Sequence, residues 1–412
     1  MNFPPPRFPQ TLPWLLGAWP LAALGAEVVG PGSGRAIFAV LAVHYALAAL
    51  LIAQIFIGPR PSPVTTAVKS YKVIVLLLLM EWAALTTLLH SQNTVFGLLK
   101  LTELAVFFLV GVAAAHICIR DGAPVFLRGF NALATGLVIA LVLAMAADIT
   151  FAEAFEDRRV PGFVHIRIFG FSATIAIAIA TASLATSSDA RGSRWFAMLL
   201  LTTGWTVLFW SASRGGMVAL ILAFAFLAVF LAPVRRVWLL WILALGMGFG
   251  LSFLFPGAGD SGTQTIFDHE LTVNSLSTGR WSLWQQVLSL ISVHPLTGHG
   301  YAQYHSLMVT AGRLPENVMP HTHNIVLEAA LAIGWPATGV LASLTAWAWA
   351  GWLRQVRAQT DELSLASLMT ASTLGAYAFV DGVYFYPESA IVFALSAGIL
   401  SSRSQHQLSV DR

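Results

Sequence analysis

The residues best suited to chemistry gather between residues 256 and 324, the only long stretch between two hydrophobic spans that is not itself hydrophobic. This stretch is rich in histidine and ends in His321-Thr322-His323-Asn324. Histidine is the usual general base near neutral pH. His321 and His323 could also bind a metal, but no cysteine and no clear third and fourth ligands accompany them. We therefore predict a base here, and we expect no metal and no cofactor.

Arg280 lies in the same stretch, at the predicted start of an amphipathic helix. Trp281, Trp284 and Leu288 follow it at helical spacing. A cation in a first helical turn opposes the helix dipole, but it is well placed if an anion binds at the same helix end. The alternative is a surface arginine beside an interfacial helix. We favour anion binding by Arg280.

Arg214 has a similar setting in Ser211-Ala212-Ser213-Arg214-Gly215-Gly216, a short connection between two spans. It is predicted to lie at a helix N-terminus at the membrane face. A lipid-linked phosphate is a plausible partner at this depth, and a snorkelling anchor is the alternative.

The composition of the chain indicates a membrane scaffold around these residues. The chain has 412 residues, of which 57% are hydrophobic and only 10% are charged, whereas soluble domains average about 25% charged residues. A soluble globular protein is therefore excluded. The single cysteine, Cys118, excludes an internal disulfide bond, and we expect no nucleic-acid partner. The predicted fold class is all-α, a polytopic membrane protein with about twelve transmembrane helices.

Each expected span is long enough, or nearly so, to cross a bilayer as a helix. The expected spans are about 12–31, 36–57, 71–90, 97–118, 127–149, 169–186, 195–211, 215–233, 237–255, 325–353, 363–381 and 387–402. Residues 1–255 then hold nine helices, residues 256–324 form one large outer loop with short helices, and residues 325–412 hold three more helices, all in one membrane-embedded domain. Gly334 and Pro336 predict a break after a half-helix.

The distribution of lysine and arginine sets the expected orientation. With both termini inside, fourteen of these residues lie on the inner side, seven lie on the outer side, and Lys100 lies within a span. This bias agrees with the positive-inside rule and places the large loop outside. We therefore expect an inner-membrane protein with its active site facing the periplasm.

All seven outer cations are arginines, whose planar fork suits phosphate oxygens. Ion pairs or lipid headgroups are the preferred explanation for Arg35 and Arg313. The others are predicted to share one anion-binding pocket: Arg158, Arg159, Arg167, Arg214 and Arg280. For Lys100, a structural ion pair with Glu103 or Glu81 is favoured over neutralisation of a phosphate.

The motifs occur in a characteristic order: Ser213-Arg214-Gly215-Gly216, Gly279-Arg280-x-x-x-Trp284, Pro295-Leu296-x-Gly298-x-Gly300, and His323-Asn324-x-x-Leu327-Glu328 with Gly334 and Gly339. Over about residues 205–345 this set resembles the O-antigen ligase and Wzy polymerase superfamily of bacterial envelope enzymes. Each motif alone is weak, and the ordered set is fairly specific.

The resemblance implies a metal-independent, inverting transfer of a glycan from undecaprenyl pyrophosphate on the outer face of the inner membrane. It implies that Arg214 and Arg280 hold the pyrophosphate and that His323 activates the acceptor hydroxyl, although His321 stays an alternative base. Further candidates for substrate binding are His321, Asn324, Lys100, Arg158, Arg159 and Arg167.

Within the superfamily, the length of the chain favours the ligase, which joins O-antigen to lipid A–core oligosaccharide. The expected partners are undecaprenyl-pyrophosphate-linked O-antigen, lipid A–core and membrane lipids. A polymerase or a protein O-oligosaccharyltransferase is the alternative. A transporter of lipid-linked glycans is the non-enzyme alternative, but it predicts repeat symmetry and charges at the midplane, and the sequence suggests neither.

Overall fold

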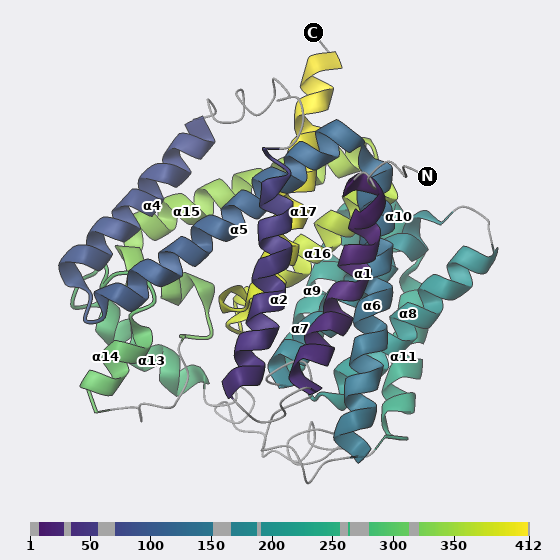
Figure 1. The fold of residues 1–412 in the computed structure, drawn as a ribbon, viewed down its shortest axis with the longest axis horizontal. Coiled ribbons are helices and arrows are strands. Elements are labelled where there is room, and N and C mark those ends of the chain that lie inside the picture. Colours follow the sequence, from purple (N-terminus) through teal and green to yellow (C-terminus); the bar gives the residue numbers. More distant parts are fainter. Residues whose placement is uncertain are drawn as a thin grey trace, which may run out of the picture.

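The computed structural model describes residues 8–28, 34–56, 71–150, 166–187, 191–255, 263, 280–312 and 321–410. Within these residues every regular element is a helix (Figure 1). The predicted all-α class is thereby confirmed for the described part of the chain.

Twelve of the described helices overlap the twelve expected spans, with ends that differ by several residues. They are α1 (Phe8–Val28), α2 (Gly34–Ala53), α4 (Tyr71–His90), α5 (Thr94–Asp121), α6 (Ala123–Thr150), α7 (Ile166–Thr186), α8 (Arg191–Trp210), α9 (Arg214–Phe230), α11 (Trp238–Ser252), α15 (Ile325–Ala358), α16 (Glu362–Ala378) and α17 (Pro387–Val410). The short elements are α10 (Ala232–Arg236), α13 (Arg280–Ile291), α14 (Tyr304–Thr310) and the 3-10 helix η3 (Val383–Phe385).

Five of the described helices are long and apolar enough to cross a membrane, namely most of α4, α5, α6, α7 and α15. Many large apolar side chains also point outward, such as Leu239 at 62% and Leu254 at 70% exposure. Outward apolar surface is expected where lipid replaces water, and continuous helices satisfy their own backbone groups there. These features indicate a multi-pass membrane protein. The number of crossings and the side on which the large loop lies stay predictions.

Helices α7 and α16 form the centre of the bundle. Helix α7 packs on α6, α8 and α16, while α16 also packs on α9 and α17. Nearly every residue of α16 is buried, and small side chains such as Ser367 and Thr370 let its neighbours approach closely. The C-terminal end of α16 leads directly into the turn at residues 379–382, which is where the site described below is built.

The predicted break in α15 is confirmed at Gly334, which adopts φ 77° and ψ 165° between two helical segments. Only glycine adopts this conformation readily. A Cβ at this position would also overlap the backbone carbonyl of Leu296. The Pro295-to-Gly300 segment and the break in α15 therefore fit against each other.

The break leaves helix carbonyls that need donors from elsewhere. The N–H of His299 donates to the C=O of Leu331 at 2.7 Å, and the N–H of Gly300 donates to that of Ala332 at 3.0 Å. The C=O of Ile333 accepts the indole N–H of Trp82 from α4 at 3.1 Å. This bracing fixes the direction of the half-helix that follows the His321–Asn324 sequence.

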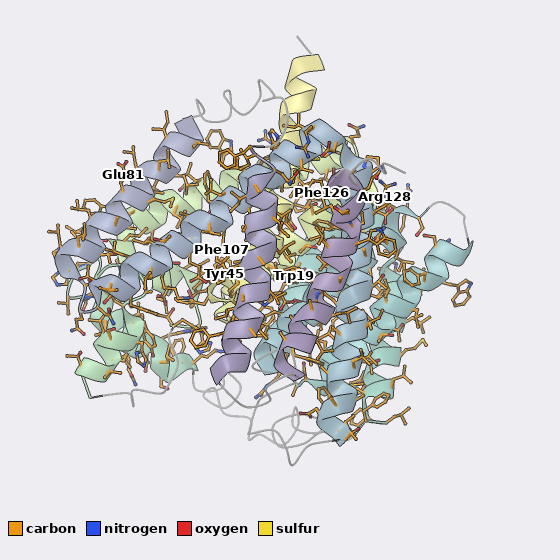
Figure 2. The ribbon with its side chains drawn as sticks, viewed as in Figure 1. Trp19, Tyr45, Glu81, Phe107, Phe126 and Arg128 are labelled. Atoms are coloured by element: carbon orange, nitrogen blue, oxygen red, sulfur yellow. The ribbon has the colours of Figure 1, made fainter. Side chains whose placement is uncertain are left out.

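The predicted amphipathic helix beginning at Arg280 is confirmed as α13. Its apolar side, with Val287 and Ile291 fully buried, packs with Tyr304 of α14 and with Leu327 and Leu331 of α15. Figure 2 shows the side chains of the whole bundle, and Figure 1 shows α13 and α14 beside one end of α4 and α15. Helix α13 is thus tied to the first half of α15 by a small apolar core of its own.

Candidate active site

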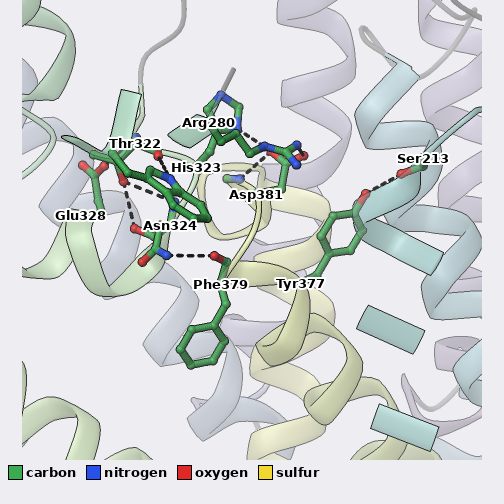
Figure 3. A network of polar contacts seen from close by, with 11 residues as sticks. Ser213, Arg280, Thr322, His323, Asn324, Glu328, Tyr377, Phe379 and Asp381 are labelled. Carbon is green, nitrogen blue, oxygen red and sulfur yellow. Dashed lines mark hydrogen bonds and ion pairs between the residues drawn. The ribbon is translucent and has the colours of Figure 1, made fainter. Parts of the chain in front are cut away.

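A single buried carboxylate, that of Asp381, joins two of the residues that the sequence predicts to be catalytic (Figure 3). Its Oδ1 lies 2.7 Å from Nδ1 of His323, and its Oδ2 accepts a hydrogen bond from Nη2 of Arg280 at 2.9 Å. The Asp381 and His323 side chains are each only 3% exposed, and that of Arg280 is 17% exposed. A guanidinium, a carboxylate and an imidazole therefore form one chain of polar contacts.

The turn after α16 fixes the position of Asp381. Its backbone N–H donates to the C=O of Tyr377 at 2.9 Å, and its Oδ1 also accepts the N–H of Gly382 at 2.7 Å. These two backbone contacts fix the direction of the carboxylate independently of its contacts with His323 and Arg280. Sequence reasoning did not single out Asp381, although an ionisable residue within an expected span is a signal of a functional role.

His323 is held at the N-terminus of α15. The side chain of Asn324 caps the helix by accepting the N–H groups of Val326 and Leu327 at 2.9 and 3.0 Å. Its Nδ2 donates to the C=O of Phe379 at 2.9 Å. Asn324 therefore connects the histidine sequence to the same turn that carries Asp381, and its observed role is structural.

His321 has a different environment from His323. Its ring stacks on Phe385 with centroids 5.1 Å apart and planes 26° apart. A Cβ at Gly382 would overlap this ring, so the glycine makes room for it. The two imidazole centroids lie 4.2 Å apart. Nδ1 of His323 lies 2.7 Å from Oδ1 of Asp381, a contact that would orient this ring for proton transfer.

Arg214 begins α9, as predicted. The preceding Ser213 hydroxyl lies 2.5 Å from the phenol oxygen of Tyr377 in α16. The ring of Tyr377 lies against Gly215 and Gly216, where a Cβ would come within 3.0 and 3.1 Å of it. The N-terminus of α9 is thereby fixed on the residue whose carbonyl accepts the N–H of Asp381.

Three motifs far apart in the sequence thus meet one short segment, residues 377–382. The Ser213-to-Gly216 motif contacts Tyr377, Arg280 contacts Asp381, and the His323-Asn324 motif contacts Phe379 and Asp381. Figure 3 shows these contacts together. The segment was expected to end a span, and the structure makes it the common anchor of the site.

Lys100 forms the structural ion pair that the sequence favoured, with its Nζ 2.6 Å from Oε2 of Glu103. Tyr45 of α2 donates a hydrogen bond to the other oxygen of Glu103. The ammonium also lies 5.9 Å from the ring centroid of Phe385, the ring on which His321 stacks. Lys100 is therefore near the site but already paired, and phosphate binding by it stays a prediction.

The structure does not test the predictions for the other outer arginines. Arg158, Arg159 and Arg313 lie outside the described residues. Arg167 is in the first turn of α7 and Arg35 is in α2, but their side chains lie outside the described part. In the described part, no three His, Cys, Asp or Glu side chains lie together as a metal site would require.

The phenols around the site are poor proton acceptors. Burial raises the pKa of Tyr384 well above its ordinary value, and the nearby Glu328 carboxylate raises it further. Burial also raises the pKa of Tyr304 to about 12. These phenols stay neutral near pH 7 and do not act as bases there.

A shallow hollow of about 540 Å³ lies along the polar side of α13, which is opposite the side that carries Arg280 and Trp284. It is lined by Ser282, Gln285, Gln286 and Ser289, which follow a helical period along one side. All four are uncharged hydrogen-bonding side chains. Such a surface can pair with hydroxyl groups without attracting ions.

Comparison with known proteins agrees with this part of the chain. Residues 196–342 match the family model described as O-Antigen ligase, and members of that family are enzymes that transfer glycans from lipid-linked substrates. The matched segment contains Arg214, Arg280 and His323 but not Asp381. No curated protein matches the chain.

Proposed function

We propose that the chain is an O-antigen ligase, which moves a glycan from undecaprenyl pyrophosphate to lipid A–core oligosaccharide at the periplasmic face of the inner membrane. The observation that carries this proposal is the contact of Asp381 with both His323 and Arg280, together with the family match over residues 196–342. The contact supplies a base and a cation at one point, as glycan transfer from a pyrophosphate requires.

His323 serves as the general base. An ionised carboxylate can only accept hydrogen bonds, so the neutral ring carries its hydrogen on Nδ1, facing Asp381, and keeps the lone pair of Nε2 for a substrate proton. When Nε2 takes that proton, the ring becomes a cation and Asp381 stabilises it. A base positioned in this way typically contributes about 10²–10⁴-fold to a rate.

Arg280 and Arg214 bind the pyrophosphate. Negative charge grows on the leaving phosphate during transfer, and fixed donors in a partly dry site stabilise it. The guanidinium fork matches two phosphate oxygens at once. Arg214 adds the N-terminal end of α9, where backbone N–H groups and the helix dipole also favour an anion.

The reaction is a single displacement. The oxygen of an acceptor hydroxyl attacks the anomeric carbon, the bond from that carbon to the pyrophosphate oxygen breaks, and undecaprenyl pyrophosphate leaves. The proton of the hydroxyl moves to Nε2 of His323. One attack from the face opposite the leaving group inverts the anomeric centre.

A hollow lies along the side of α13 opposite Arg280 and is lined by uncharged hydroxyl- and amide-bearing side chains. These side chains can pair with the hydroxyl groups of a glycan that extends beyond the pyrophosphate site. These features support a glycan as the group transferred.

The test is reconstitution of the purified protein in liposomes with lipid-linked glycan and lipid A–core, in the presence of a metal chelator. We expect the glycan to appear on lipid A–core. A lengthened donor would instead identify a polymerase, glycan on an added pilin-like protein would identify an oligosaccharyltransferase, and movement of the donor without a covalent product would identify a transporter.

The variant His323→Ala should abolish transfer while the protein keeps its wild-type melting temperature to within a few degrees. His305→Ala is the matched control and should stay active, since His305 lies in α14 and has no role in the proposed chemistry. If His321→Ala is the inactive variant and His323→Ala is active, the base has been assigned to the wrong imidazole.

A further inference from the structure

Thr322, between the two histidines of the site, is held on both sides of its backbone. Its N–H donates to Oε2 of Glu328 in α15 at 3.0 Å, and its C=O accepts the indole N–H of Trp284 in α13 at 3.2 Å. Its own hydroxyl donates to the C=O of Asn324 at 2.9 Å. Two helices therefore fix the peptide groups that flank this residue.

The next residue, His323, has a backbone conformation that needs such support. Its φ is +55°, in the left-handed region. This conformation is strained for a residue with a Cβ and persists only where the surroundings hold it. The hydrogen bonds of Thr322 on one side and the cap formed by Asn324 on the other side supply that constraint.

We propose that Glu328 and Trp284 are positioning residues, which hold the imidazole of His323 on Asp381 by fixing the backbone of Thr322. This inference rests on the proposed function in taking His323 as the base. Glu328 is only 3% exposed, so its carboxyl group is committed to contacts inside the protein. Its Oε2 accepts the N–H of Thr322.

The spacing of Arg280 and Trp284 gives α13 a double role. Residues four apart lie on the same side of a helix. Arg280 contacts Asp381, and Trp284 contacts Thr322. One side of α13 thus holds both the carboxylate and the loop that carries the imidazole, so the distance between these two groups depends on the placement of α13.

The experiment compares Trp284→Phe, which removes the N–H donor but keeps an aromatic ring, with Trp281→Phe in the same helix. It also compares Glu328→Leu with Glu328→Gln, which keeps an acceptor oxygen for the N–H of Thr322. The first readout is hydrogen exchange of the backbone amides of residues 322–324 in the purified full chain. This readout requires no enzymatic activity.

We expect amide exchange in this loop to be at least about tenfold faster in Trp284→Phe and Glu328→Leu, and unchanged in Trp281→Phe. Glu328→Gln should keep most of the protection. In the transfer assay, kcat should fall by about tenfold or more in the first two variants, while KM for the donor changes by less than about threefold. Glu328→Gln should recover most of kcat.

Wild-type amide protection in both Trp284→Phe and Glu328→Leu would overturn the inference. Equal loss in Glu328→Gln and Glu328→Leu would also overturn it, because the acceptor oxygen would then not be what matters. If Glu328→Leu does not fold, Trp284→Phe and Glu328→Gln decide the question. If the wild-type chain transfers no glycan, the proposed function fails, and the exchange data still decide whether the two residues hold the loop.

Discussion

The Nδ1 atom of His323 lies 2.7 Å from Oδ1 of Asp381, although 58 residues separate them in the sequence. The other oxygen of this carboxylate holds Arg280. This sharing makes the base and the cation of the site depend on each other, because a shift of Asp381 would move both. The predictions below follow from this arrangement and from the bracing of α15.

Asp381→Asn should reduce kcat by about 10²–10⁴-fold, which is the contribution of a positioned base. The amide has nearly the same shape, but it has no charge to stabilise the protonated ring of His323 and can favour the wrong tautomer. The measurement is glycan transfer to lipid A–core in liposomes. Asp121→Asn, which removes a carboxylate paired with Arg120 in α5, is the control. Activity of Asp381→Asn within twofold of wild type would contradict the prediction.

Arg280→Lys should lose most transfer activity, by about 10²-fold or more, since one removed transition-state donor typically costs that much. A lysine ammonium cannot reproduce the planar fork toward a phosphate. Arg403→Lys serves as the control, because Arg403 contacts Asp361 and Ser364 elsewhere in the bundle. Near-normal ligation by Arg280→Lys would count against the assigned role.

Gly334→Ala should reduce the free energy of unfolding by about 2–4 kcal/mol, because the Cβ would have an unfavourable φ and would overlap the carbonyl of Leu296. Gly339→Ala, in the same helix, should be neutral or stabilising by up to about 1 kcal/mol, since nothing lies within 4 Å of its added Cβ. Unfolding in detergent measures both. Equal effects of the two substitutions would show that the break in α15 does not require glycine at position 334.

Stability should decrease as the pH falls below about 6.5. Burial lowers the pKa of His299 in the folded state, and its Nε2 lies 2.9 Å from the C=O of Leu290, to which the neutral ring can donate. The unfolded chain then binds more protons than the folded chain below an ordinary histidine pKa of about 6.5, so acid favours unfolding. The stabilisation is complete above that pH.

The measurement for His299 is the melting temperature at several pH values between about 5 and 8, for the wild type and for His299→Gln. Glutamine can still donate to the C=O of Leu290 but does not titrate. The variant should therefore show a weaker dependence on pH. Identical slopes in the two proteins would rule out His299 as a cause.

The sequence predicted the helices well, because apolar runs and their breaks follow local rules. Residues 280–291 form the expected amphipathic helix, and α15 breaks at Gly334 as expected. The histidine and arginine candidates were found because residue type and helix position alone indicate what each could do. Lys100 was correctly assigned to a structural ion pair with Glu103, since residues three apart face each other on a helix.

The partner of these groups could not be predicted in the same way. Asp381 is 101 residues from Arg280 and 58 residues from His323 in the sequence. A local sequence pattern cannot indicate a contact between residues that are so far apart in the chain. Its neighbour Gly382 makes room for the ring of His321, a contact that also joins segments far apart in the sequence. The roles of Trp284 and Glu328 depend likewise on how α13 and α15 meet.

The order in which the ribosome makes these residues has a consequence for the cell. The carboxylate that aligns Arg280 and His323 is synthesised after both of them, at the end of the penultimate long helix. A chain whose synthesis has stopped before Asp381 would contain Arg280 and His323 but not the carboxylate that contacts both of them. The proposed activity would therefore start only after α16 and the turn that follows it have been synthesised and inserted.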